Sequence, residues 1–260
     1  TVSGTSAING GSVKTASIQT YSGAVTLGAD TTITTTDSTV TFGNTVDSDS
    51  TARALTLTAG TGNIDFDDAV GNTDALGDVT ITSVATLDTD GMFKAASFTQ
   101  SAGSVATQFD GAVTLTGKFD FTGEALTFNA AANSVGGTMD VSNAGLFTTA
   151  DVASITVTDQ FTQDGIGTSS LGGNLTGTAG IDFSTAILLT GSDAVTLVTG
   201  GGAGQDIVLG TDNTTDITGT GQALTLNAGA AGDITIEGDV GGSSAALGAI
   251  IVSNADQVRF

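Results

Sequence analysis

Apolar and polar residues alternate strictly in short segments of three to five residues, from one end of this chain to the other. An alternation with a period of two gives a β-strand one buried face and one face in water. Clusters of Gly, Asn, Asp and Ser separate these segments, as is typical of turns. Candidate strands therefore come about every ten residues. Examples are 17–20, 25–27, 32–34, 39–42, 55–58, 63–66, 79–82, 113–116, 118–121, 126–128, 154–157, 181–183, 206–209 and 250–252.

Two long stretches of the chain, 24–84 and 194–254, form an imperfect repeat. Ala54-Leu-Thr-Leu-Thr-Ala-Gly returns as Ala223-Leu-Thr-Leu-Asn-Ala-Gly, and Ala24-Val-Thr-Leu returns at Ala194 with nearly the same offset. Because the repeat covers turns as well as strands, it indicates a chain built by stacking similar units. No change of composition marks a domain boundary, so we expect residues 1–260 to form one continuous β-solenoid. A shorter phrase, Phe-Thr-Gln, also occurs twice, at 98–100 and 161–163.

Short strands at this spacing suit either a β-sandwich or a β-solenoid. The long repeat favours the solenoid, and so does the choice of apolar residues. Nearly every inward position is Val, Ile, Leu, Ala or Phe, and such side chains form aligned ladders when coils stack about 4.8 Å apart. The chain has no Pro, which could not donate a hydrogen bond to a neighbouring strand. The sequence therefore predicts an all-β, parallel β-solenoid of about ten coils with little or no helix.

The charge balance narrows the range of partners. The chain has 27 acidic and 5 basic residues, and its net charge is −22. Five basic residues cannot neutralise a nucleic-acid backbone or hold the chain on an anionic membrane. No apolar run is long enough for insertion into a membrane. With no Cys and no His, a Cys metal site and a His-dependent nucleophilic triad are excluded.

Two features could bind calcium. Gly201-Gly-Ala-Gly-Gln-Asp206 and the three residues after it match the nonapeptide of calcium-binding β-rolls, whose turns hold each ion between oxygen ligands. The next nine residues break the pattern, which favours a chance match in a glycine-rich chain. Asp65 and Asp67 are two residues apart, so on a strand they share a face and could coordinate a hard cation. A solvated acidic face is the favoured interpretation of this pair.

Asp65, Asp67 and Asp206 are thus the calcium candidates, and calcium is the only cofactor left open. Further carboxylates that lie close together in the sequence are Asp47, Asp49, Asp68, Asp88 and Asp90.

Long runs of this sequence resemble the repeats of giant bacterial surface proteins. The runs Ala54–Gly71 and Leu76–Thr82 are similar in style to those of filamentous-haemagglutinin-type adhesins, and the similarity spans essentially the whole chain. The resemblance implies that the solenoid is a right-handed parallel β-helix. It also implies secretion, display on the bacterial cell surface, and a role in adhesion or in building extracellular filaments. It carries over no catalytic residue.

Parallel β-helices also serve as polysaccharide lyases and hydrolases. A lyase for acidic sugars needs a basic residue that takes a proton and cations that neutralise the substrate. A hydrolase needs two carboxylates at a defined separation, which can arise by chance among 27 acidic residues. We expect no enzyme activity, because the basic residues are scattered singly; they are Lys14, Arg53, Lys94, Lys118 and Arg259.

The sequence thus predicts a non-catalytic structural segment of an extracellular bacterial adhesin or cell-surface filament. We expect it to be a mature region or a part of a longer protein. Its expected partners are further coils of the same chain, or identical copies placed end to end, and a surface ligand that the sequence does not identify. The alternatives are a carbohydrate-binding or carbohydrate-processing β-helix and a calcium-stabilised surface-layer module.

Overall fold

The computed structural model describes residues 1–211, 216–241 and 246–260, and these residues form strands and turns but no helix. Accordingly, none of the described segments could cross a membrane as a helix. The undescribed residues, 212–215 and 242–245, fall within the second copy of the long repeat. The chain divides into two compact units, which we call unit 1 (Thr1–Asn129) and unit 2 (Ala130–Phe260).

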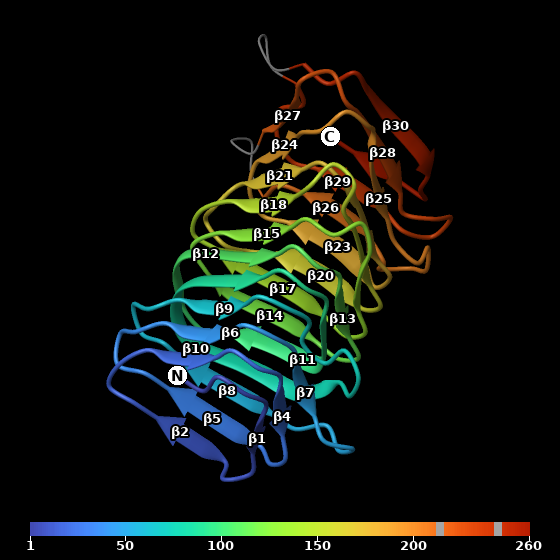
Figure 1. Ribbon diagram of the computed structural model, residues 1–260. Helices are drawn as coiled ribbons and strands as arrows, with labels where there is room; N and C mark the ends of the chain where they lie inside the picture. The colour runs from blue at the N-terminus through green and yellow to red at the C-terminus, as the bar shows by residue number, and fades with distance from the viewer. Residues whose placement is uncertain (212–215, 242–245) are drawn as a thin grey trace. The chain divides into compact units, whose positions relative to one another are not determined.

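Unit 1 is a stack of coils that contribute strands to three parallel sheets, with an isolated bridge at Val70 in place of one strand of the first sheet (Figure 1). The first sheet begins with β1, β4 and β7, the second with β2, β5 and β8, and the third with β3, β6 and β9. The long strands β10 and β11 continue around a corner, so each of them pairs in two sheets. The strands are β1 Ser6–Ile8, β2 Ser12–Lys14, β3 Gln19–Tyr21, β4 Val25–Leu27, β5 Thr31–Thr34, β6 Val40–Phe42, β7 Val46–Ser48, β8 Leu55–Thr58, β9 Ile64–Phe66, β10 Leu76–Thr89, β11 Phe93–Gln100, β12 Gly103–Phe109, β13 Val113–Leu115, β14 Phe119–Gly123 and β15 Leu126–Phe128.

Unit 2 has the same three-sheet construction. Its first sheet contains β16, β19, β22, β25, β28 and β30, its second β17, β20, β23, β26, β29 and β31, and its third β18, β21, β24 and β27. The strands are β16 Asn133–Val135, β17 Met139–Asn143, β18 Phe147–Thr149, β19 Ser154–Val157, β20 Gln160–Gln163, β21 Ser169–Leu171, β22 Asn174–Gly177, β23 Gly180–Phe183, β24 Ile187–Leu189, β25 Val195–Val198, β26 Ile207–Leu209, β27 Ile217–Gly219, β28 Ala223–Asn227, β29 Ile234–Ile236, β30 Ala249–Asn254 and β31 Val258–Arg259.

The prediction of a parallel β-solenoid is confirmed, with about 12 turns rather than about ten. The number is larger because some coils are short. The register places Ser6 beside Val25 in unit 1 and Val195 beside Leu224 in unit 2, and the chain between the second pair is clearly longer. Apart from a few long strands such as β10 and β11, the strands are of similar length, so the corners account for most of this variation. The right-handed sense of the coil remains a prediction.

Aromatic rings form ladders inside unit 1. In the third sheet Tyr21, Phe42 and Phe66 stack, with centroids 5.2 and 4.9 Å apart and nearly parallel planes. Thr89 interrupts the ladder, and Phe109 and Phe128 resume it at 5.3 Å. These rings are at most 5% exposed, and each sits at an inward position of an alternating strand. The ladder follows from the parallel register, which places the same position of successive strands side by side.

The interior of unit 2 is mainly aliphatic. Phe161 and Phe183 pack at 4.9 Å, but Phe183 is the last buried aromatic residue along the chain. The buried apolar residues beyond it are aliphatic; they are Ile187, Leu189, Val195, Leu197, Ile207, Leu209, Ile217, Leu224, Leu226, Ala228, Ile234 and Ile236.

Candidate functional site

A cluster of five aspartates lies on the outer face of the third sheet of unit 1. Asp65, in the middle of β9, lies between Thr41 of β6 and Asp88 of β10 in the register of the sheet. Asp67, Asp90 and Asp110 form a second row, just after the ends of three strands of this sheet. Their backbone N–H groups each donate to a carbonyl of the preceding coil, at 2.9–3.0 Å. We call Asp65, Asp67, Asp88, Asp90 and Asp110 the acidic cluster.

Three members of the acidic cluster could share a cation. Carboxylate oxygens of Asp88, Asp90 and Asp110 all lie within 4.8 Å of one another. Two amide groups already contact this group: Gln108 donates to Oδ1 of Asp110 at 2.9 Å, and Asn129 donates to the same oxygen at 2.6 Å. Asp88 has a buried Oδ1 for which no hydrogen-bond partner occurs in the described residues.

Burial and mutual repulsion make two of these carboxyls weaker acids. Burial raises the pKa of Asp65 above its ordinary value of 3.8, and the charges of Asp67 and Asp88 raise it further. A hydrogen bond from Thr41 opposes this rise. Burial likewise raises the pKa of Asp88, followed by the charges of Asp90 and Asp110.

No cationic side chain offsets this charge in the part of the chain that the structure describes. The ion pairs there join Arg53 to Asp49, Lys118 to Asp120, and Arg259 to Asp233.

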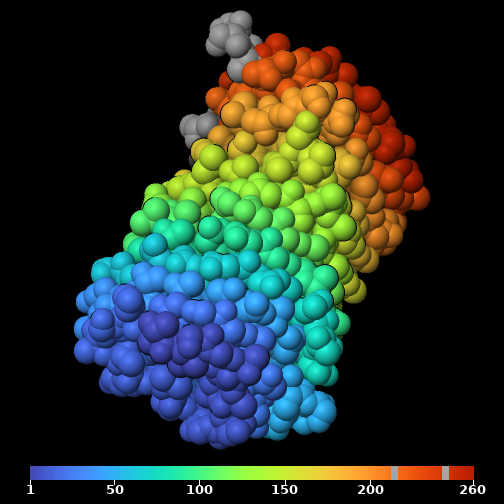
Figure 2. Space-filling model, viewed as in Figure 1, coloured from blue at the N-terminus to red at the C-terminus, as the bar shows by residue number. Residues whose placement is uncertain are grey.

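The acidic cluster matches the ligand preference of a hard divalent ion better than the needs of a hydrolase. Calcium takes six to eight oxygen ligands and tolerates irregular geometry, so three carboxylates and several waters could complete its shell. A glycoside hydrolase needs its two carboxyls in a cleft that holds the sugar. The acidic cluster lies on the outside of a sheet, and the coils of each unit close against one another on the face that Figure 2 shows.

The structure places the three predicted calcium candidates in different settings. Asp65 and Asp67 lie in the acidic cluster of unit 1. Asp206 lies in unit 2, just before β26, where its Oδ1 accepts the backbone N–H of Asp233 at 2.8 Å. Asp206 therefore joins its own coil to the next one. The interpretation of its glycine-rich stretch as half of a calcium turn remains untested.

Sequence reasoning missed Asp110, although a signal for it exists. Asp90 and Asp110 both precede a Gly and then a strand of the first sheet, β11 or β13. This shared Asp-Gly phrase marks equivalent corners of successive coils. Asp90 and Asp110 are one coil apart, and so are Asp65 and Asp88. The coil from Asp65 to Asp88 is longer than the coil from Asp90 to Asp110. The sequence does not give these coil lengths, so it could not predict that the carboxylates of Asp88, Asp90 and Asp110 lie close together.

Several other aspartates of this chain link neighbouring coils. Their carboxylates accept backbone N–H groups from a later coil: Asp30 from Ala54 at 3.0 Å and Asp37 from Thr61 at 2.9 Å. Asp151 reaches further and accepts the N–H of Ser192, two coils later, at 2.9 Å. The abundance of Asp thus has a structural use, since a short carboxylate at a corner satisfies donors that the sheets leave free.

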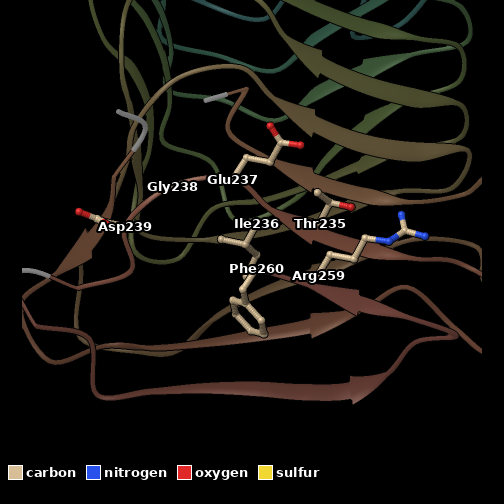
Figure 3. Close-up of a pocket in the computed structure, with 7 residues that line it drawn as sticks. All are labelled: Thr235, Ile236, Glu237, Gly238, Asp239, Arg259 and Phe260. Atoms are coloured by element: carbon tan, nitrogen blue, oxygen red, sulfur yellow. The ribbon is translucent and has the colours of Figure 1, made fainter. Parts of the chain in front are cut away.

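Two recesses lie at the coil ends of the units. One, of about 480 Å³, is lined by residues of the first coil of unit 1, among them Val2, Ile8 and Val13. The other, of about 520 Å³, lies at the last coil of unit 2. Figure 3 shows its lining: Asp239 and Arg259 lie on opposite sides, with the ring of Phe260 between them at the margin.

In comparisons with known proteins, no family model, no curated protein and no solved structure matches this chain. The resemblance to filamentous-haemagglutinin-type adhesins therefore remains a prediction from the style of the sequence.

Proposed function

We propose that this chain is a non-catalytic structural segment of an extracellular bacterial adhesin or cell-surface filament. The observation that supports this proposal is the uninterrupted parallel stacking within each unit. Among the described residues, successive coils pair in parallel, through strands or, at Val70 in the first sheet and Val240 in the third, through isolated bridges. Such a stack can be lengthened coil by coil, and each added coil contributes the same kind of interface. That property suits a shaft.

The outer surface fits the same role. Most outward positions of the strands hold Thr, Ser or Asp, as in the row Thr20, Thr41 and Asp65 of the third sheet. Negative charge along such a surface discourages sideways association of sheets.

A carbohydrate-binding β-helix would present aromatic rings to its ligand, because sugar sites need apolar platforms beside polar groups. The aromatic residues of this chain are 12 Phe and one Tyr. Only Phe260 among them is exposed in the described residues. The carbohydrate alternative is therefore the weaker proposal.

Surface display can be tested on the cells that make this chain. Antibodies raised against the purified chain should label intact cells as strongly as permeabilised cells, and external proteinase K should remove the label. An antibody against a cytosolic protein serves as the control and should label only permeabilised cells. Labelling of this chain only after permeabilisation would contradict the proposal.

A second function, a calcium-stabilised surface-layer module, is supported by the group of Asp88, Asp90 and Asp110. An ion that binds only the folded state stabilises it by mass action. Millimolar calcium should then raise the melting temperature by about 3 °C over the value in chelator. The triple change of these residues to Asn should abolish the rise, whereas Asp74→Asn, at an exposed position of unit 1, should keep it. No response of the original chain to calcium would exclude this function.

A further inference from the structure

Threonine residues form two parallel rows on the outer face of the second sheet of unit 1. In the first row, Thr32 of β5 lies beside Thr56 of β8, and Thr56 lies beside Thr80 of β10. In the second row, Thr34 lies beside Thr58. Figure 1 shows β5 and β8 side by side near the blue end of the chain. We call Thr32, Thr34, Thr56, Thr58 and Thr80 the threonine face.

Further hydroxyl groups extend both rows. Ser12 of β2 precedes the first row and Thr99 of β11 follows it, so every coil from β2 to β11 places a hydroxyl group there. The register shifts by one residue within β10, and Ser83 therefore continues the second row beside Thr58. The result is an array of hydroxyl groups that repeats in two directions, along the strands and from coil to coil.

The hydroxyl groups of the threonine face are available to a ligand. They have no hydrogen-bond partner among the described residues, whereas the hydroxyls of Thr31 and Thr35, at neighbouring inward positions, donate to backbone carbonyls. Thr32 is exposed, and the other four side chains are half-buried. Because β-branched Thr has few χ1 rotamers, a packed row of Thr holds its hydroxyl groups in a repeating orientation before any ligand binds.

No charged residue interrupts the threonine face. The outer face of the third sheet differs, because there Thr41 lies beside Asp65 of the acidic cluster. An uncharged array without aromatic rings offers little to a cation or to a sugar. Charged residues border the array instead; they are Lys14, Asp30, Asp78 and Asp120.

The dimensions of the array suit one ligand in particular. Successive coils are about 4.8 Å apart, and residues two apart on one strand are separated by about 6.7 Å. Oxygen atoms at the surface of an ice crystal repeat at similar distances along two directions. Hydroxyl groups with this repeat can hydrogen-bond water molecules that also belong to the crystal. A fixed repeat in two directions therefore favours a crystalline ligand over a single small molecule.

We infer that the threonine face of unit 1 is an ice-binding surface, which holds this chain on an ice crystal through its two rows of hydroxyl groups. Many weak contacts form together, because the parallel sheet fixes all of the hydroxyl groups in advance. This binding is additional to the proposed structural role and does not depend on it.

Thermal hysteresis of the purified 260-residue chain tests the inference. A protein that binds ice lowers the freezing temperature of a crystal below its melting temperature, and this gap should grow with the concentration of the original chain. The chain should also become concentrated in ice that is grown slowly from a dilute solution. Thr56→Lys and Thr32→Lys should each reduce the gap at least about fivefold, because a long, strongly hydrated ammonium group keeps the face away from the crystal.

Thr20→Lys is the matched control. Thr20 is half-buried at the outward position in the middle of β3, as Thr56 is in β8, but β3 belongs to the third sheet. This variant carries the same change of charge and should keep the full gap. Far-ultraviolet circular dichroism and the melting temperature should agree among all four chains, which separates loss of ice binding from loss of folding.

Three results would overturn the inference: an original chain that produces no gap and is excluded from the ice, a Thr56 variant that keeps the full gap, or a Thr20 variant that loses it. Either of the last two would show that ice does not bind at the threonine face. None of them affects the labelling of intact cells, so this inference and the proposed function can fail independently.

Discussion

The two units contain one phrase, Phe-Thr-Gln, at the same place in the second sheet but with different surroundings. Gln163 ends β20 in unit 2, and its Nε2 donates to Oδ1 of Asn143 at 2.7 Å and to the carbonyls of Gly165 and Gly167 at 3.1 Å. Gln100 ends β11 in unit 1 and is equally buried. Its Oε1 accepts the Thr107 hydroxyl at 2.8 Å, but its Nε2 has no partner among the described residues.

The difference shows that a corner, rather than the strand before it, decides whether a buried amide is satisfied. In unit 2 the longer corner between β20 and β21 places the carbonyls of Gly165 and Gly167 at the amide of Gln163. Only glycine fits at position 167, because a Cβ there would lie 1.6 Å from the carbonyl oxygen of Gly145. In unit 1 only residues 101 and 102 separate β11 from β12, and a Cβ at Gly103 would lie 2.3 Å from the Nε2 of Gln100. The two interiors therefore depend on different interactions: aromatic stacking in unit 1, and aliphatic packing with an amide network in unit 2.

The largest expected effect concerns the aromatic interior of unit 1. Phe66→Ala removes a fully buried ring from the stack with Phe42, and we expect it to lower the free energy of unfolding by about 4 kcal/mol. Leu226→Ala, at an equally buried position in unit 2, should cost about 3 kcal/mol, because less volume is removed. Urea denaturation gives the magnitudes, and hydrogen exchange read separately over each unit locates them. Equal costs would argue against a special contribution from the ring stack.

Gln163 and Gln100 should differ clearly in how much a change to Leu lowers the free energy of unfolding. Gln163→Leu leaves the Oδ1 of Asn143 and the Gly165 carbonyl without their donor, although the Thr185 hydroxyl still donates to the Gly167 carbonyl, so we expect a loss of about 3 kcal/mol. Gln100→Leu removes one hydrogen bond and one unsatisfied donor, so its effect should stay within about 1 kcal/mol of zero. Both changes are measured by denaturation under the same conditions. A similar loss in both variants would mean that the two corners satisfy their amides equally well.

The acidic cluster should make unit 1 respond to pH in an unusual direction. The folded-state pKa values of Asp65 and Asp88 are raised, so their ionised forms disfavour the folded state. This penalty is present at pH 7 and disappears as the pH falls through the raised values toward about 4. Asp88→Asn should therefore raise the free energy of unfolding at pH 7 by up to about 1 kcal/mol, because it removes a like charge beside Asp65.

Denaturation at pH 7 and pH 4.5 checks this prediction. The stability gained on acidification should be smaller in Asp88→Asn than in the original chain. Asp74→Asn, away from the acidic cluster, should leave the pH profile unchanged. A larger gain of stability on acidification in the Asp88 variant would contradict the raised pKa of Asp88.

Unit 2 should show the opposite dependence, with the smallest effect. Hydrogen bonds from the Ser192 hydroxyl and N–H lower the pKa of Asp151 below its ordinary value. The stabilisation from this carboxylate is therefore present above about pH 4 and lost as the pH falls through the lowered value. Asp151→Ala should increase hydrogen exchange around Ser192 at pH 7 and change nothing at pH 2.5. An unchanged exchange rate at pH 7 would show that the hydrogen bonds between Asp151 and Ser192 contribute nothing to local stability.

The two copies of the long sequence repeat both form strands, but matching strands do not always join the same sheet. In unit 1 its first two phrases form β4 and β8, which lie in different sheets. In unit 2 the matching phrases form β25 and β28, which pair directly, Val195 beside Leu224. All three sheets require the same alternation of apolar and polar residues, so a phrase such as Ala-Leu-Thr-Leu specifies a strand and not a sheet. The corner before it decides which sheet it joins.

The sequence by itself determined the strands, the parallel solenoid and the inward residues, because each depends on a local alternation and on residue types that suit stacked coils. It also indicated Asp65 and Asp67 as neighbours, since residues two apart on a strand share a face. Only the tertiary structure decided the number of turns, the partner of Asp206, and the position of Asp110 beside Asp88 and Asp90. Those features depend on coil length, and the turn residues that set coil length carry no periodic signal, so contacts between coils emerge only from the completed stack.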